Sequence, residues 1–206
     1  LVFSPIQVNT YFLADKSGEC AIIDCGCYDK NEFKTLVNFI ESKNLNPVLI
    51  LNTHCHLDHI FGNRFLKEKY KLSPWSGEAE EANRKNATSH ALLFGLTMEE
   101  PPEPEGFITV GQKIGFGNNT LLALHVPGHA PGSFAFYSQS DGCVFTGDAL
   151  FSGSIGRTDL PGGSFKTLLK SIKSQLLTLP GETVVYSGHG PETTIEREKN
   201  TNQYLI

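Results

Sequence analysis

A histidine-rich segment is the part of this sequence best suited to chemistry. Residues 53–59 read Thr-His-Cys-His-Leu-Asp-His, so three of the seven histidines and one carboxylate fall within six residues. Crowded imidazole and carboxylate groups need a partner for their lone pairs, and a first-row divalent metal is such a partner. In an extended segment His54 and His56 point to the same side, while Asp58 and His59 begin a turn and can face a neighbouring position. The spacing therefore allows two groups of metal ligands.

Three further candidate ligands each come just after a predicted strand and beside glycine. They are His129, Asp148 and His189. Glycine permits tight backbone geometry, and loops held by a rigid sheet commonly carry active-site residues. Taken singly, each could be a capping or turn residue. Together with the histidine-rich segment they complete a ligand set.

The elements that must position these side chains are strands with helices between them. Strands are expected over residues 8–13, 20–24, 47–52, 107–110, 119–126, 134–138, 143–146 and 183–186, and helices over residues 31–43, 60–69, 77–94 and 165–177. Thr193 with Glu196 resembles a capping box that opens a last helix. Residues 98–106 contain three prolines and are predicted to form a surface loop. A length of 206 residues fits one domain, 1–206, with a substantial core.

Composition narrows the classes of partner. The net charge is −5, with 17 Lys+Arg against 22 Asp+Glu and no basic block, so binding to nucleic acid or to an anionic membrane surface is not expected. Aliphatic runs are only a few residues long, whereas a membrane-spanning helix needs about 20 apolar residues. Five unclustered cysteines favour reduced thiols, and hence the cytoplasm, over a disulfide framework. The oligomeric state is left open.

The combined motifs resemble a known family. The segment 54–59, taken with His129, Asp148 and His189, resembles the metallo-β-lactamase-fold hydrolases. The stretch 150–159 is typical of their short glyoxalase II-like (hydroxyacylglutathione hydrolase-like) branch. The resemblance implies an α/β fold, a four-layer αβ/βα sandwich in which two packed mixed sheets are flanked by helices.

The resemblance also implies a ligand set and metals at one edge of the two sheets. By the family pattern, one metal would be bound by His54, His56 and His129, the second by Asp58, His59 and His189, and Asp148 would bridge them. Zinc, as one or two ions, is the expected cofactor, with iron or manganese as alternatives.

The implied activity is hydrolysis of a small-molecule thioester, such as an acylglutathione of the S-lactoylglutathione type, by a metal-bound hydroxide. Asp58, which could orient the hydroxide, and Asp148 are the catalytic candidates. A mononuclear-iron persulfide dioxygenase of the same fold is the alternative, because that branch shares much of the motif. Zinc β-lactamases are less favoured, since they often place a cysteine where Asp148 stands.

Three outlying residues are candidates for supporting roles. Asp24, at the end of a predicted strand, and Asp159 could accept the second N–H of a ligating histidine. Asp24 could equally be a turn residue. Arg157 could bind a substrate carboxylate through its two-pronged guanidinium, or form a structural salt bridge with Asp159.

Overall fold

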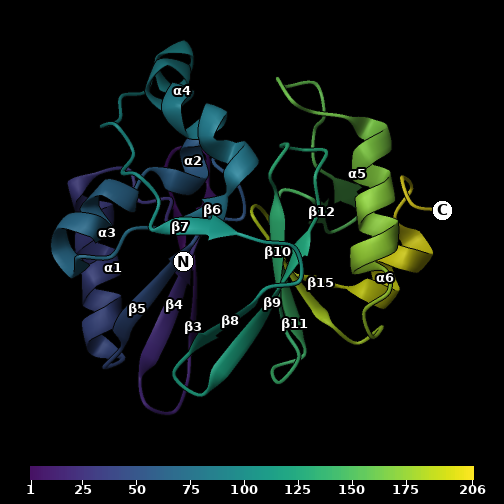
Figure 1. Cartoon of the computed structure of the whole chain (residues 1–206), viewed down its shortest axis with the longest axis horizontal. Coiled ribbons are helices and arrows are strands. Elements are labelled where there is room, and N and C mark those ends of the chain that lie inside the picture. The colour runs from purple at the N-terminus through teal and green to yellow at the C-terminus, as the bar shows by residue number, and fades with distance from the viewer.

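The computed structural model describes residues 1–206, in which two mixed sheets lie face to face (Figure 1). The first has the strand order β3-β4-β5-β6-β7, formed by β3 (Tyr11–Ala14), β4 (Glu19–Ile23), β5 (Asn46–Leu51), β6 (Trp75–Gly77) and β7 (Gly106–Ile108). The second has the order β15-β14-β11-β10-β9-β8, formed by β8 (Lys113–Phe116), β9 (Asn119–His125), β10 (Phe134–Ser138), β11 (Cys143–Gly147), β14 (Val184–Ser187) and β15 (Thr193–Thr194). Two small hairpins are separate: β1 (Val2–Phe3) with β2 (Val8–Asn9), and β12 (Leu150–Phe151) with β13 (Ser154–Ile155).

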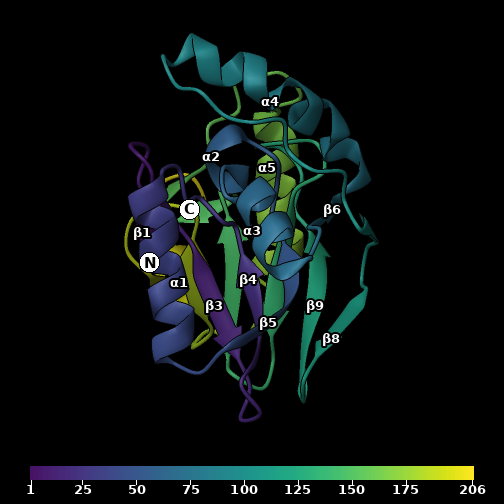
Figure 2. The same cartoon turned by 90° about the vertical axis from the view of Figure 1, so that its left-hand side faces the viewer.

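Helices cover the outer face of each sheet. The first sheet is covered by α1 (Lys30–Ser42) and α3 (Asn63–Tyr70), and the second by α5 (Phe165–Ser171) and α6 (Ile195–Thr201) (Figure 1). The helices α2 (Leu57–Ile60) and α4 (Glu81–Leu93) lie at one end of the sheets, as the side view in Figure 2 shows. The layers follow the order helices, sheet, sheet, helices. This order confirms the expected α/β four-layer sandwich.

Side-chain alternation along the strands builds the layers, because successive residues of a strand point to opposite faces. In β4, Ile22 packs with Leu36 of α1, while Ile23 belongs to the cluster between the sheets. In β10, Phe136 belongs to that same cluster, while Tyr137 packs in the cluster that contains the helix residues of α5. Apolar burial on both faces of both sheets thus holds the four layers together.

The helix predicted over residues 60–69 is wrong at its start. The structure has two helices there, with α2 ending at Ile60 and α3 beginning at Asn63. Gly62 lies between them, and its N–H donates to the carbonyl of Cys25 at 2.8 Å. A Cβ on Gly62 would overlap the Cys25 side chain, so this close approach fixes the chain between the helices.

Other boundaries also differ from the prediction. The helix expected over 77–94 starts later, because Gly77 ends the strand β6 and residues 78–80 form a 3₁₀ turn before α4. The helix expected over 165–177 is regular only to Ser171 and continues as a π-helical turn. The last helix is capped by Thr194, which accepts from the Arg197 N–H, and not by Thr193.

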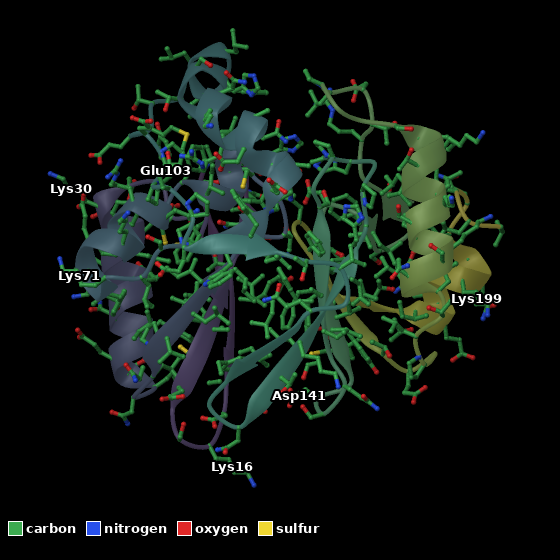
Figure 3. The ribbon with its side chains drawn as sticks, viewed as in Figure 1. Lys16, Lys30, Lys71, Glu103, Asp141 and Lys199 are labelled. Atoms are coloured by element: carbon green, nitrogen blue, oxygen red, sulfur yellow. The ribbon has the colours of Figure 1, made fainter.

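The two ends of the sandwich have different structures. The β3–β4 and β10–β11 turns, marked by Lys16 and Asp141 in Figure 3, lie together at one end. The other end carries α2 and α4 and the loops that follow β4, β5, β9, β11 and β14. None of the helices combines the length and the apolar character that crossing a bilayer requires.

Candidate metal centre

Strand direction brings the candidate ligands to one edge. β4 and β5 are parallel, so Asp24 and the loop 52–56 emerge at the same edge of the first sheet. β11 and β14 are parallel, and β9 runs the same way because β10 is antiparallel to both β9 and β11. His129, Asp148 and His189 therefore emerge together from the second sheet. The two edges meet, and the seven candidate ligands lie around the junction.

One group consists of three histidines, His54, His56 and His129. The Nε2 atom of His129 lies 3.2 Å from Nε2 of His54 and 2.9 Å from Nδ1 of His56. The ligand atoms of the group all lie within 4.8 Å of one another. Such short nitrogen–nitrogen distances need shared protons or a cation between the rings, and an ion bound by all three satisfies every lone pair.

The second group contains Asp58, His59 and His189, whose ligand atoms also lie within 4.8 Å of one another. The Nε2 atom of His189 is 3.1 Å from Oδ2 of Asp58. Nε2 of His59 is 3.7 Å from that same oxygen. The second group, like the first, combines residues of both sheets.

Asp148 lies between the two groups. Its Oδ1 is 3.3 Å from Nε2 of His59, and its Oδ2 is 3.6 Å from Nε2 of His129 and 3.8 Å from Nε2 of His189. Both Oδ1 of Asp148 and Nε2 of His59 are buried without a hydrogen-bond partner. Buried polar atoms are nearly always paired, so these two orphaned atoms are accounted for by a cation. The histidine and aspartate groups therefore fit a dinuclear metal site.

Hydrogen bonds at the far ring nitrogen fix the orientation of four histidines. At Nδ1, His59 donates to Asp24 at 2.9 Å, His129 to the carbonyl of Arg157 at 2.8 Å and His189 to the carbonyl of Gln7 at 3.1 Å. Nδ1 of His54 lies 3.1 Å from the hydroxyl of Thr53. Each of these rings thus directs Nε2 toward the centre, as metal-ligating histidines usually do when the second nitrogen is held by a partner.

Asp24 connects to both groups. Its Oδ1 accepts from the Thr53 N–H at 2.7 Å, and its Oδ2 accepts from the Thr53 hydroxyl at 2.6 Å and from His59. Because the Thr53 hydroxyl donates to Asp24, its oxygen is free to accept from Nδ1 of His54. One buried carboxylate therefore sets the tautomer of His59 directly and that of His54 through Thr53.

Burial and neighbouring charges set the protonation of the first group. Burial lowers the pKa of His54 well below its ordinary value, and the nearby His59 and His56 act in the same direction. Burial, followed by the charge of His129, lowers the pKa of His56 to about 4. Both rings are therefore neutral at pH 7, the state in which imidazole can ligate a metal.

The carboxylates of Asp58, in the second group, and of Asp148, between the groups, are ionised. Burial alone would raise the pKa of Asp148, but His59, His129 and His189 together outweigh burial and hold that pKa well below its ordinary value. Burial also opposes ionisation of Asp58, yet His59 and the hydrogen bond from His189 lower its pKa. Burial disfavours a charged His59, but Asp148 and Asp58 raise its pKa well above the ordinary value. The carboxylates thus create a site that favours positive charge.

The remaining sequence candidates lie farther out. Arg157 and Asp159 form a bidentate ion pair at 2.7 and 2.8 Å, with 57% and 68% of the side chains exposed. The Asp159 carboxylate makes no hydrogen bond to a histidine, and it is the main-chain carbonyl of Arg157 that holds His129. The sequence shows no signal for this carbonyl or for Thr53, because main-chain and hydroxyl partners depend on the folded path of the chain.

Gly188 was also missed as a site residue. A Cβ at Gly188 would overlap the carboxylate of Asp148 and lie 2.6 Å from Cε1 of His59. The segment Ser187-Gly188-His189 therefore needs glycine so that the second group can close. The signal was present in the glycine before His189, but only the structure identifies what that glycine makes room for.

A family model described as "Metallo-beta-lactamase superfamily" matches residues 4–189. The "Probable metallo-hydrolase YqgX" of Bacillus subtilis is 40% identical over 206 residues, which is 98% of this chain and 93% of that protein. The "Hydroxyacylglutathione hydrolase GloC" of Haemophilus influenzae is 36% identical over 201 residues, covering 97% of this chain and 93% of that protein.

Solved structures give the same picture of the fold. The B3 metallo-β-lactamase BLEG-1 has a TM-score of 0.92 and 34% identity, covering 100% of this chain and 98% of that one. TTHA1623, in a di-iron-bound form, has a TM-score of 0.90 and 38% identity, with the same coverage of 100% and 98%. ETHE1 from Myxococcus xanthus has a TM-score of 0.76 and 25% identity, covering 94% and 77%.

Proposed function

The chain belongs to the metallo-β-lactamase superfamily, whose members are generally hydrolytic enzymes, and on that premise we propose that it is a metal-dependent hydrolase of thioesters. The proposed substrate class is an acylglutathione of the S-lactoylglutathione type. Support for this class comes from the Haemophilus influenzae relative, which is named as a hydroxyacylglutathione hydrolase and aligns over nearly the whole chain.

One observation carries the proposal: a single carboxylate, Asp148, faces both groups of ligands. Its two oxygens lie within 3.8 Å of ring nitrogens from His59, His129 and His189. In the proposed assignment, His54, His56 and His129 would hold one ion, Asp58, His59 and His189 would hold the other, and Asp148 would serve both. The proposed metal is zinc. Iron is the first alternative, since imidazole and carboxylate ligands suit both metals and TTHA1623 has been seen with two irons.

When bound, such ions supply a hydroxide nucleophile at neutral pH and polarise a carbonyl. The chain's own residues hold the ligands still: Asp24 and the Arg157 carbonyl orient His59 and His129. Cys55 is no competing nucleophile, because it is buried and because burial, with the nearby Glu80, raises the pKa of its thiol well above the ordinary value. The substrate carbonyl would approach from the side of His56 and His189, where the rings are only half-buried.

Two further aspects of the proposal concern context. We propose that residues 1–206 act as one domain, because each ligand group combines side chains from both sheets. We also propose that the protein works in the cytoplasm, where buried thiols stay reduced. All five cysteines are free and buried.

The test is hydrolysis of S-lactoylglutathione by protein reconstituted with zinc or with iron, followed as loss of thioester absorbance. We expect metal-dependent turnover with KM between about 1 μM and 1 mM. His56→Ala should abolish turnover while circular dichroism shows an unchanged fold. Two parallel assays separate the alternatives within the fold: hydrolysis of a chromogenic β-lactam, and oxygen consumption with glutathione persulfide. A folded, metal-loaded protein active only in one of these parallel assays refutes the thioesterase.

A further inference from the structure

A buried carboxylate outside both ligand groups, that of Glu80, joins the loops that carry the three-histidine group. Glu80 is fully buried, and it lies where the 3₁₀ turn of residues 78–80 leads into α4, the helix across the end of the sheets in Figure 2. Its Oε1 accepts from the Gly132 N–H at 2.6 Å. Its Oε2 accepts from the Cys55 N–H at 2.9 Å and from the Asn83 amide at 2.8 Å.

The two main-chain donors belong to different sheets. Cys55 stands between His54 and His56 in the loop after β5 of the first sheet. Gly132 stands three residues after His129 in the loop after β9 of the second. The carboxylate of Glu80 therefore spans the junction at the point where the two sheets contribute their histidines to one group.

Local glycines show that this contact is tightly fitted. A Cβ at Gly132 would lie 2.9 Å from the main-chain nitrogen of Glu80 and 3.0 Å from its Cγ. A Cβ at Gly77, just before the 3₁₀ turn, would overlap the Gly132 carbonyl. Two glycines on opposite sides thus allow the turn that bears Glu80 to sit directly against the His129 loop.

The charge of Glu80 is compensated only by these donors. The nearby Arg84 pairs with Glu81 and Glu103, and no lysine or arginine forms an ion pair with Glu80. An ionised carboxylate is acceptor-only, which matches the donors on both oxygens. A buried charge destabilises the fold unless all of its hydrogen bonds are made. The two loops must therefore stay at the spacing at which both main-chain N–H groups reach the Glu80 carboxylate.

We infer that Glu80 is a positioning residue, whose carboxylate sets the spacing between the His54–His56 loop and the His129 loop and thereby the metal affinity of the three-histidine group. The inference rests on the proposed function only in that these histidines hold an ion. The second group has separate supports, with His59 held by Asp24 and His189 by the Gln7 carbonyl. The effect of Glu80 is therefore confined to one of the two ions.

Glu80→Gln is the decisive variant because it keeps the size and shape of the side chain. Oε1 faces one loop N–H and Oε2 faces the other, so in either orientation the new amide group places a donor against a main-chain donor. One of the two loops must then move away. Glu80→Asp keeps the acceptor-only head but withdraws it by one methylene, and we expect it to recover part of the lost affinity.

Glu198 provides a matched control. It is also fully buried and has no ion pair, and it accepts from the Gly153 N–H at 2.9 Å, the Thr193 hydroxyl at 2.6 Å and the Asn202 amide at 2.8 Å. These bonds tie α6 to the β12–β13 hairpin and touch neither histidine loop. A second control is Asn83→Ala, which removes one donor to Glu80 and leaves both loop contacts in place.

The experiment is a titration of metal-free protein with Zn²⁺ in the presence of a competing chelator, with Co²⁺ absorption spectra as a second readout. His129→Ala and His189→Ala serve as references for loss of each group. For Glu80→Gln we expect one ion to bind as in the unchanged protein and the other, the one lost in His129→Ala, to bind about 10- to 100-fold more weakly. For Glu198→Gln and Asn83→Ala we expect the affinities for both ions to be unchanged. We expect Glu198→Gln to lower the melting temperature about as much as Glu80→Gln does.

Two results would overturn the inference. One is Glu80→Gln binding both ions as the unchanged protein does. The other is an equal loss of affinity for both ions in Glu80→Gln and in Glu198→Gln. Glu80 would then stabilise the fold as a whole and would not position one group of ligands. If Glu80→Gln does not fold, the same comparison is made with Glu80→Asp. Failure of the proposed function is seen separately: an unchanged protein that binds two ions but cleaves no thioester leaves this inference intact.

Discussion

Asp24→Asn should weaken metal binding in both groups while the protein stays folded. The carboxylate accepts from Thr53 and from His59 at distances between 2.6 and 2.9 Å, and its side chain is 2% exposed. An asparagine that keeps an oxygen toward the Thr53 N–H must direct its amide group at Nδ1 of His59. His59 then carries its proton on Nε2, the nitrogen that faces Asp148, and no longer offers a lone pair there. The Thr53 hydroxyl must also accept from that amide group, so its own O–H is released from residue 24 and turns toward Nδ1 of His54, which moves the proton of that ring to Nε2.

The magnitudes follow from these lost contacts. Loss of the partner of a ligating histidine costs about 10- to 100-fold in metal affinity, and here one histidine of each group is affected. Hydrogen bonds to a charged group contribute about 1.5–3 kcal/mol, so the free energy of unfolding should fall by about 2–3 kcal/mol. Backbone strain does not add to this, because Asn tolerates the left-handed φ of 54° that Asp24 adopts.

The assay is zinc titration against a chelator, paired with chemical unfolding of the metal-free protein. Thr10→Val is the matched control, because the Thr10 hydroxyl donates to the Asp24 carbonyl at 2.8 Å and accepts from the Gly26 N–H at 3.0 Å. It destabilises the same loop by about 1–3 kcal/mol without touching the carboxylate. Zinc affinity should fall in Asp24→Asn and stay unchanged in Thr10→Val. Equal zinc affinities in Asp24→Asn and the unchanged protein would refute the reasoning.

Three further outcomes are expected. Gly188→Ala should lower kcat/KM about 100-fold, because a shift of about 1 Å in ligand position has that effect. Gly115→Ala should leave kcat/KM nearly unchanged, because a Cβ there meets nothing closer than 4.0 Å. Similar losses in both variants would contradict the steric argument. Removing metal with a chelator should lower the melting temperature by roughly 5–10 °C, since an ion at 100 times its Kd adds about 2.7 kcal/mol to the free energy of unfolding. A melting temperature that does not change with metal in a calorimetric scan would count against stabilisation of the fold by the ions. Arg157→Ala should change the free energy of unfolding by less than about 1 kcal/mol, because its ion pair is exposed. It should raise KM for a thioester that bears a carboxylate, whereas Asp159→Asn should leave that KM unchanged. An unchanged KM in Arg157→Ala would remove Arg157 from the substrate site.

The candidate ligands could be recognised in the sequence because their residue types are rare and their spacing is local. The segment 54–59 needs only an extended turn to separate its two ligand pairs, and the structure brings both pairs to the expected groups. The strand-end glycines pointed to the other three candidates, since loops at strand ends converge whenever their strands run in parallel.

What the sequence could not indicate depends on distant partners. Glu80 lies in an acidic run at the start of a predicted helix, and such a residue is usually exposed. It is buried because loops from residues 55 and 132 close over it. The break at Gly62 depends in the same way on contact with Cys25. The strand β6 has three residues, too few for any periodicity, and is defined only by its pairing with β5 and β7.

The path of the chain between the two sheets has a consequence for any attempt to divide the protein. The proline-rich loop after α4 is the natural place for a cut, yet the next strand, β7 (Gly106–Ile108), pairs with β6 and so belongs to the first sheet. The C-terminal fragment would thus carry the edge strand of its partner, and each fragment would hold only part of every ligand group. Two such fragments should reassemble by strand donation, and divalent metal should strengthen their association because each ion would bind residues of both fragments.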